Sequence, residues 1–282
     1  MARSTARRRV VRVRIDADGE GVHAVSLRED VLAAEEPLEI RIDGSSWAVT
    51  MRTPGDDFDL VAGFLVGEGV LTAPDQLRSL RYCAGRNAEG EQTYNVIDAH
   101  LGAGAVPPSD AAARHSTTTS ACGICGTESI EAVAKTARLP LGAAEPLVDA
   151  AVVAQLPDTL RDSQQVFDAT GGVHAAGLFA PDGTAVCVRE DVGRDNAVDK
   201  VIGWALRDGR LPLAQHVLQV SGRASFELVQ KARLAGIPML AAVGAPSTLA
   251  AQLAHDTGLT LVGFSRNGSF AIHAHPERVV GI

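Results

Sequence analysis

The chain has 282 residues, of which 46% are hydrophobic and 21% charged, with 28 Gly and 13 Pro. This is the composition of a globular protein with a large core, and it excludes wholesale disorder, collagen and a disulfide-stapled miniprotein. The net charge is −8 although six arginines lie in the first fourteen residues, so the remaining body is strongly acidic, and with only 4% aromatic residues it is not expected to bind nucleic acid.

Residues 1–15 form a basic N-terminal arm, which we expect to be a disordered, solvated tail unless it docks on an acidic partner. No apolar stretch follows its arginines, so it does not have the form of an export signal. The longest uncharged stretch, 234–254, is interrupted by Gly and Pro and is not expected to span a membrane. Four cysteines suit a reducing compartment, and the expected location is the cytoplasm.

Residues 16–101 are expected to form a small β-rich N-terminal lobe. Alternating apolar residues and turn signals, including Asp18-Gly19 and Gly44, predict that its first strands form one small antiparallel sheet together with the end of the arm. A helix is expected after the Pro54–Asp57 turn, ending near Gly67 or Gly69. The strands are expected at 10–15, 22–27, 38–42, 47–51, 80–83 and 94–99.

Residues 102–126 are rich in Ala, Gly, Pro, Ser and Thr and are expected to form a mobile loop. Residues 127–282 then alternate strands with helices, which predicts a layered α/β domain. Its clearest unit is a strand–helix–strand crossover in which Ser247 caps the helix and Gly258 ends it. Strands are expected at 173–179, 185–188, 217–220, 238–243, 259–264 and 270–273, and helices at 127–137, 196–206, 226–234 and 247–255.

The residues best suited to chemistry are Cys122 and Cys125, which form a CxxC motif at a junction between a loop and a helix. Flanking glycines leave the sulfurs approachable, and N–H groups at the helix start stabilise a thiolate, so this motif can carry a sulfur nucleophile. A structural zinc site would normally need a second ligand pair, which Cys83, Cys187 and the scattered histidines do not offer. A thioredoxin-like redox motif is the other alternative, although that fold expects CxxC directly after a strand.

Several further motifs occur in a fixed order along most of the chain, and together with the CxxC motif they make it resemble the FdhD family of formate dehydrogenase accessory proteins. Two positions depart from the family pattern: Asp195 stands where His is expected, and Gly244 where Ser is expected. The motifs are Thr53-Pro54-Gly55-Asp56-Asp57, Gly63-Phe64-Leu65, Glu68-Gly69, Cys122-Gly123-Ile124-Cys125-Gly126, Thr170-Gly171-Gly172-Val173-His174-Ala175-Ala176, Glu190-Asp191-Val192-Gly193-Arg194, Asn196-Ala197-Val198-Asp199-Lys200, Ser221-Gly222-Arg223-Ala224-Ser225-Phe226-Glu227, Ala245-Pro246-Ser247 and Gly263-Phe264-Ser265-Arg266.

The resemblance implies a sulfurtransferase. Such a protein would accept sulfur from a cysteine desulfurase as a cysteine persulfide and pass it to the molybdenum of the bis(molybdopterin guanine dinucleotide) cofactor, before that cofactor enters the catalytic subunit of formate dehydrogenase. The family points to Cys122 as the persulfide carrier with Cys125 as its partner, while the helix dipole slightly favours Cys125. Cys83 and Cys187 lie within strand patterns and are expected to be packed as small apolar residues.

The cofactor would be a bound acceptor, and no permanently bound cofactor or metal is expected. Because it is large and anionic, its site should collect cations and glycine-rich turns at strand-to-helix junctions. Each such arginine could equally be a solvated surface charge, and His174 a core histidine. Asp191 and Asp199 are expected either to cap helices and pair with Arg194 and Lys200 or to contact a guanine edge. The candidate cofactor-binding residues from this argument are Gly172, His174, Arg194, Arg223 and Arg266, and the resemblance implies the stretch 264–269 as a further part of the site, which is Phe264, Ser265, Arg266, Asn267, Gly268 and Ser269.

The resemblance further implies a C-terminal domain like that of cytidine deaminases. Deamination itself is not expected, because Ala176 stands where an H-x-E motif has its catalytic Glu. The sequence thus predicts an α/β protein with a smaller β-rich N-terminal lobe, and the resemblance adds a cytidine-deaminase-like C-terminal domain. Whether two copies of the chain form a homodimer stays open. Two other functions stay open: a cofactor-binding chaperone whose CxxC is structural, and a disulfide oxidoreductase.

Overall fold

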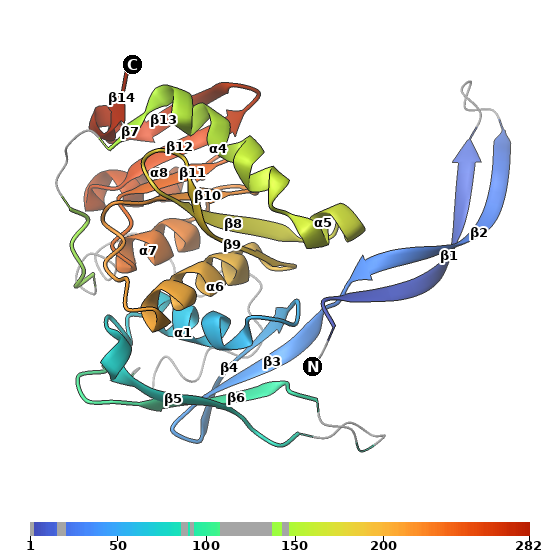
Figure 1. The fold of residues 1–282 in the computed structure, drawn as a ribbon, viewed down its shortest axis with the longest axis horizontal. Coiled ribbons are helices and arrows are strands. Elements are labelled where there is room, and N and C mark those ends of the chain that lie inside the picture. Colours follow the sequence, from blue (N-terminus) through green and yellow to red (C-terminus); the bar gives the residue numbers. More distant parts are fainter. Residues whose placement is uncertain (1–2, 16–20, 86–89, 91–92, 108–136, 143–146) are drawn as a thin grey trace.

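The computed structural model in Figure 1 describes the chain except residues 1–2, 16–20, 86–89, 91–92, 108–136 and 143–146. Cys122, Cys125 and residues 127–136 of the helix expected at 127–137 therefore lie outside the described residues. Of the described helices, none is both long and apolar enough to cross a membrane.

A six-stranded sheet, ordered β13-β12-β11-β10-β8-β9, forms the centre of the C-terminal half. β10, β11 and β12 are parallel and β8 runs antiparallel to β10, so the fold class is α/β as predicted. The expected crossover is confirmed, since β11 and β12 are joined by a helix that begins at the Ser247 cap and ends at Gly258. The strands are β8 (His174–Phe179), β9 (Ala185–Asp191), β10 (Val217–Val220), β11 (Met239–Ala242), β12 (Thr260–Arg266) and β13 (Ser269–Ala274).

Helices cover both faces of this sheet (Figure 1). α6 (Arg194–Arg207), α7 (Phe226–Leu234) and α8 (Thr248–Thr257) bury their apolar residues against one face. α4 (Ala150–Asp162) buries Val153, Leu156 and Leu160 against the other face and is followed by α5 (Gln165–Thr170). Neither α4 nor α5 is predicted from the sequence pattern, and α4 contains Pro157, a residue that usually marks the end of a helix.

The N-terminal lobe contributes a second sheet, ordered β4-β3-β6-β5, and α1 (Asp57–Gly67), which lies between this sheet and α6. α1 and α6 touch backbone to backbone, because a Cβ on Gly63 would overlap the carbonyl of Asp199 and one on Gly203 would overlap that of Asp59. One apolar core therefore runs from the small sheet through both helices to the large sheet. The four strands are β3 (Glu36–Ile42), β4 (Ser45–Arg52), β5 (Leu77–Tyr82) and β6 (Val96–Leu101).

The prediction of one small antiparallel sheet from the first four strands is wrong. Within the part of the chain that the structure describes, β1 (Thr5–Ile15) and β2 (Val22–Ala33) pair only with each other, in a two-stranded ribbon that projects from the body (Figure 1). β3 instead takes β6 as a parallel neighbour, a pairing between distant segments that local alternation does not reveal. The basic arm is therefore largely strand β1 and not a disordered tail. Short elements complete the structure: η1 (Pro74–Gln76), β7 (Val148–Asp149), η2 (Pro276–Arg278) and β14 (Val279–Val280).

Candidate functional site

The ends of five strands meet at one edge of the large sheet. The loops after β10, β11 and β12 are tied together there, since Gly244 N–H donates to the Gly222 carbonyl at 2.9 Å and Phe264 N–H donates to the Gly244 carbonyl at 3.0 Å. β8 starts and β9 ends at the same edge, because each is antiparallel to its neighbour. Ligands of open α/β sheets collect at such an edge.

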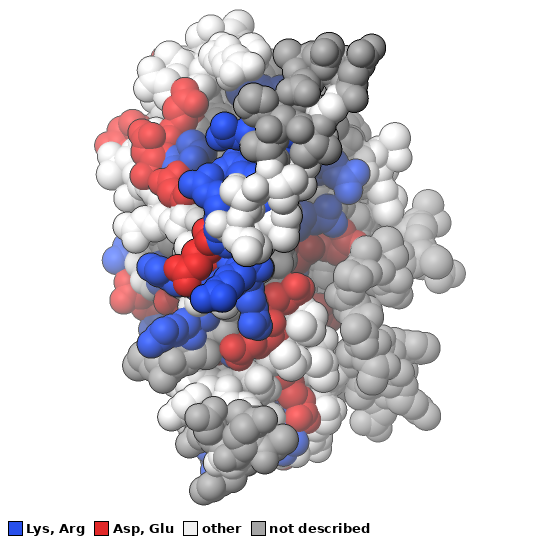
Figure 2. All heavy atoms as spheres, turned by 90° about the vertical axis from the view of Figure 1, so that its right-hand side faces the viewer, with Lys and Arg blue, Asp and Glu red and all other residues white. Residues whose placement is uncertain are grey.

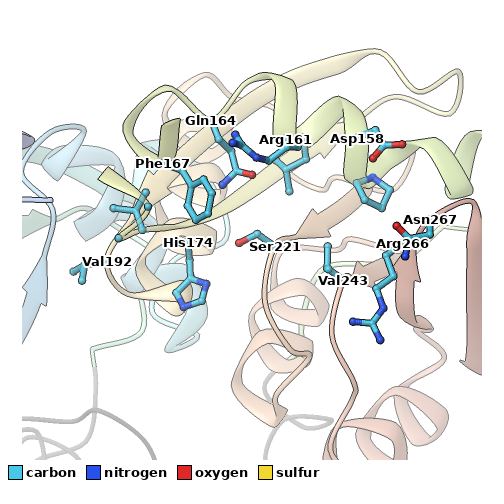
Figure 3. Close-up of a pocket in the computed structure, with 15 residues that line it drawn as sticks. Asp158, Arg161, Gln164, Phe167, His174, Val192, Ser221, Val243, Arg266 and Asn267 are labelled. Atoms are coloured by element: carbon cyan, nitrogen blue, oxygen red, sulfur yellow. The ribbon is translucent and has the colours of Figure 1, made fainter. Parts of the chain in front are cut away.

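A cavity of about 610 Å³ lies at this edge, with α4 and α5 as its opposite wall (Figure 3). Four candidate residues line it: Gly172, His174, Arg266 and Asn267. In Figure 3 His174 lies with Phe167 at one end, and Arg266 with Asn267 at the other. The cavity has further lining residues that are not among the sequence-predicted candidates, which are Pro157, Asp158, Leu160, Arg161, Gln164, Phe167, Gly171, Val173, Val192, Ser221 and Val243.

His174 begins β8 at the rim of the cavity, where its ring nitrogen Nδ1 lies beside Gly222. Partial burial and the nearby charge of Arg194 hold the pKa of His174 below its ordinary value. The imidazole is therefore mainly neutral at pH 7, with one ring nitrogen able to donate and the other able to accept a hydrogen bond. His174 is therefore not a buried core histidine, which was the alternative expectation for this residue.

Two arginines bring positive charge to the cavity wall. The guanidinium of Arg161 lies 4.7 Å from the ring centre of Phe167 and pairs with Asp168. Arg266 ends β12 just before a turn at Asn267 and Gly268, and no carboxylate of the described residues lies within ion-pair distance of it. The turn is closed by the Ser269 hydroxyl, which donates to the Arg266 carbonyl at 3.1 Å. A cation without an ion-pair partner at a cavity wall is suited to an anionic ligand.

The other candidate residues lie around the cavity without lining it. Arg194 starts α6 and its Nε lies 3.4 Å from the Asp195 carboxylate. Arg223 is exposed. A Cβ on Gly244 would lie 3.0 Å from the Arg223 Cγ, so the glycine that stands in place of the expected Ser leaves the Arg223 side chain more room. Ser265 is fully buried and Phe264 is 42% exposed. Only two residues of the expected stretch 264–269 therefore reach the cavity.

Beneath this edge lies a buried ion pair between Asp191 and Lys200, whose charged groups are 2.7 Å apart. The Asp191 carboxylate also accepts N–H bonds from Thr53 at 3.1 Å and Gly193 at 2.8 Å, so it joins the N-terminal lobe to the start of α6. Asp191 is fully buried, which rules out a contact with a guanine edge. The network fixes the backbone that carries Arg194.

The expected pairing of the two aspartates with Arg194 and Lys200 holds for Asp191, which pairs with Lys200, and is wrong for Asp199. Arg194 pairs with Asp195, and Lys200 pairs with Asp191. Asp199 instead accepts two hydrogen bonds from Lys231 of α7, at 2.7 and 2.9 Å, and is 2% exposed. Asp195 and Asp199 are four residues apart and lie on the same face of α6. The cation that pairs with Asp199 comes from the neighbouring helix α7, so the spacing of charges along the sequence does not predict this ion pair.

The two cysteines that the structure describes are packed residues. Cys187 is 6% exposed in β9, and burial raises the pKa of its thiol to about 11. Cys83 follows β5, where its N–H donates to the Val96 carbonyl at 2.9 Å, and it is partly buried. A thiol with so high a pKa is a poor nucleophile at neutral pH, so Cys187 is unsuited to sulfur transfer. In the described residues no group of His, Cys, Asp and Glu is arranged to hold a metal ion.

Comparison with known proteins places the chain among proteins of one kind. The model of the FdhD/NarQ family matches residues 33–280. The "Sulfur carrier protein FdhD" of Streptomyces coelicolor is 56% identical, covering 99% of this chain and 97% of the relative, and that of Mycobacterium tuberculosis is 49% identical, covering 99% and 100%. The crystal structure of a putative formate dehydrogenase accessory protein from Desulfotalea psychrophila is similar with a TM-score of 0.71 and 25% identity, covering 97% of this chain and 99% of that one.

Proposed function

The chain belongs to the FdhD/NarQ family, and from this premise we propose how it acts as a sulfur carrier in formate dehydrogenase maturation. The Cys122 thiolate attacks the terminal sulfur of a persulfide on a cysteine desulfurase. A sulfur–sulfur bond forms at Cys122 while the desulfurase cysteine leaves as a thiolate. The molybdenum of the bis(molybdopterin guanine dinucleotide) cofactor would then receive this sulfur as sulfide, because attack of the Cys125 thiolate on the Cys122 sulfur closes a Cys122–Cys125 disulfide and supplies the two electrons.

The main support for a binding site for the sulfur-accepting cofactor is the cavity at the edge of the large sheet. Arg266 and Arg161 supply positive charge for pyrophosphate, and Gly172 has no side chain to keep a ligand away from its wall. Phe167 and the neutral His174 offer ring faces and a hydrogen-bonding group at the other end. A polyanionic nucleotide cofactor fits this combination of cations, glycine and rings.

In this proposal the remaining candidate residues act around the cavity. Arg194 and Arg223 attract the anionic cofactor from the rim, since both lie at the same strand ends as His174. Asn267, Gly268 and Ser269 form the turn that presents Arg266. Phe264 and Ser265 support that turn from the preceding strand.

The carrier step is tested by incubating the full chain with a cysteine desulfurase and cysteine, without reductant, and mapping added mass by peptide mass spectrometry. We expect one extra sulfur atom on the peptide with Cys122 and Cys125, removed by reductant and absent from Cys122→Ala. Cys187→Ala is the control, which should load sulfur as the wild type does. An unmodified CxxC, especially with zinc bound, would favour the chaperone function, and insulin reductase activity would favour the oxidoreductase.

The acceptor site is tested separately with GDP as the probe, measured by calorimetry. Arg266→Ala should weaken GDP binding about tenfold or more, because a charge-assisted hydrogen bond contributes roughly 1.5–3 kcal/mol. The control is Arg210→Ala, an exposed arginine beyond the far end of α6, which should bind GDP as before. Equal affinity in Arg266→Ala and wild type would reject the placement of the site.

The partners that we propose are a cysteine desulfurase as donor, the catalytic subunit of a formate dehydrogenase as destination of the sulfurated cofactor, and a second copy of the chain in a homodimer. We further propose that the protein works in the cytoplasm, where its thiols stay reduced.

A further inference from the structure

Gln164, directly before α5, is a buried polar side chain on the wall of the cavity. It is 4% exposed and lines the cavity together with Phe167. Its backbone N–H donates to the Arg161 carbonyl at 3.2 Å, whereas its carboxamide has no hydrogen-bond partner among the residues that the structure describes. A buried amide costs free energy unless it is hydrogen-bonded, so this carboxamide is suited to contact a ligand.

The carboxamide of Gln164 points into the cavity. In Figure 3 it is directed from the start of α5 toward the strand ends that carry His174 and Ser221. The Ser221 hydroxyl accepts the Ala175 N–H at 2.9 Å, so its own proton is left to donate to a ligand. Gln164 and Ser221 therefore offer uncharged hydrogen-bonding groups to the same space.

A carboxylate from the large sheet fixes the start of α5. The two oxygens of Glu190 in β9 accept backbone N–H groups of this helix, from Val166 at 2.8 Å and from Phe167 at 2.9 Å. Gln164 and the Phe167 ring are thus held at defined positions on the cavity wall. A polar group and a ring that are already in place lose little freedom when a flat ligand binds, which favours affinity.

Charge distinguishes the two ends of the cavity. Asp158 and Arg266 lie at one end in Figure 3, while the Phe167 ring lies with the neutral His174 at the other. The phosphates of a ligand are attracted to Arg266, because charge-assisted hydrogen bonds are the stronger ones. The end with Phe167 and Gln164 is left for an uncharged part of the ligand.

The surface around the cavity attracts an anionic ligand. Lys and Arg side chains gather on the side of the molecule from which the ribbon of β1 and β2 projects (Figure 2). On this side α5 packs beside β2, and a Cβ on Gly172 of the cavity wall would lie 3.4 Å from the Ala33 Cβ at the end of β2. Because the rest of the chain is acidic, an anionic ligand is attracted mainly to this side.

We propose that Gln164 recognises a heterocycle in which a ring carbonyl stands next to a ring N–H, an edge that guanine and pterin share. The carboxamide N–H donates to the ring carbonyl, the carboxamide oxygen accepts the ring N–H, and Phe167 packs on the face of the ring. This inference rests on the proposed function, since the cofactor named there contains both rings. It adds the side chain that reads one of them.

The test measures, by calorimetry on the full chain, how Gln164→Met binds GDP, neopterin and inorganic pyrophosphate, which has no ring. Met keeps the length of the side chain and removes the amide. We expect Gln164→Met to weaken binding of GDP or neopterin about tenfold, which equals about 1.4 kcal/mol, and to leave pyrophosphate binding within about twofold. The control is Gln165→Ala, at the exposed glutamine next in the chain, which should bind all three probes as the wild type does.

The probes separate guanine from pterin and this inference from the proposed function. A loss for GDP alone assigns the contact to guanine, and a loss for neopterin alone assigns it to pterin. Unchanged binding of both ring ligands by Gln164→Met would overturn the inference and leave the proposed cofactor site standing. An equal loss of pyrophosphate binding would also overturn it, because the whole cavity would then have changed. If the wild type bound neither GDP nor neopterin, the proposed cofactor site would fail together with the inference.

Discussion

Replacing Lys200 by Met tests whether the buried ion pair beneath the site stabilises the fold. The Lys200 ammonium lies 2.7 Å from the Asp191 carboxylate and donates to the Thr53 carbonyl at 2.9 Å. Both charged side chains are at least 98% buried. Met keeps the apolar stem of the lysine but removes the charge, so Asp191 stays buried without its cation.

The expected loss in the free energy of unfolding depends on which hydrogen-bond donors remain around the Asp191 carboxylate. Breaking a buried pair costs about 3–5 kcal/mol, because one charge is left without compensation. Asp191 keeps N–H donors from Thr53, Gly193 and Asn196, which places the expected loss near the lower end, at about 3 kcal/mol. This is a fifth or more of the roughly 5–15 kcal/mol by which a domain is stable.

The assay is urea unfolding followed by circular dichroism at pH 7. The control is Arg210→Met, which breaks an exposed pair with Asp208 and should cost about 1 kcal/mol or less. The double variant Asp191→Asn/Lys200→Met should recover much of the loss, since neither charge is then buried. A loss below 1 kcal/mol for Lys200→Met, or no recovery in the double variant, would refute the reasoning.

Three further predictions concern single groups. Gly203→Ala should destabilise the protein by about 1–3 kcal/mol in the same assay, because its Cβ overlaps the Asp59 carbonyl; a gain of about 1 kcal/mol, usual for Gly→Ala in a helix, would disprove the close contact. With a pKa of about 11, only about one Cys187 thiol in 1,000 is ionised at pH 8, so N-ethylmaleimide should modify it only after urea is added, and rapid native labelling would contradict its burial. The NMR titration midpoint of His174 should lie below 6.5 and should rise in Arg194→Ala. Because protonation of His174 is disfavoured in the folded state, this group lowers the stability of the protein as the pH falls below 6.5. A midpoint above 6.5 would contradict the observed surroundings of the ring.

The sequence determined the elements whose signals are local. The α8 helix is an example, since a Ser247 hydroxyl that accepts from Ala250 N–H and a glycine at φ 75° are properties of the helix ends alone. The α/β class and the family followed from such signals and from the order of the motifs. Gly172, His174 and Arg266 were also predicted this way, because they lie at strand ends or turns next to β8 and β12, whereas Asn267 was predicted from the family resemblance.

Tertiary structure decided which of the candidate residues face a common cavity and which charges pair. Arg161, Gln164 and Phe167 became cavity wall only because α4 and α5 pack across the sheet, and no spacing in the sequence links them to Arg266. Lys231 reaches Asp199 from a neighbouring helix in the same way. A local pattern specifies a backbone conformation through a few neighbouring residues, whereas a cavity or a buried ion pair depends on how distant segments pack, and that packing is set by the whole core.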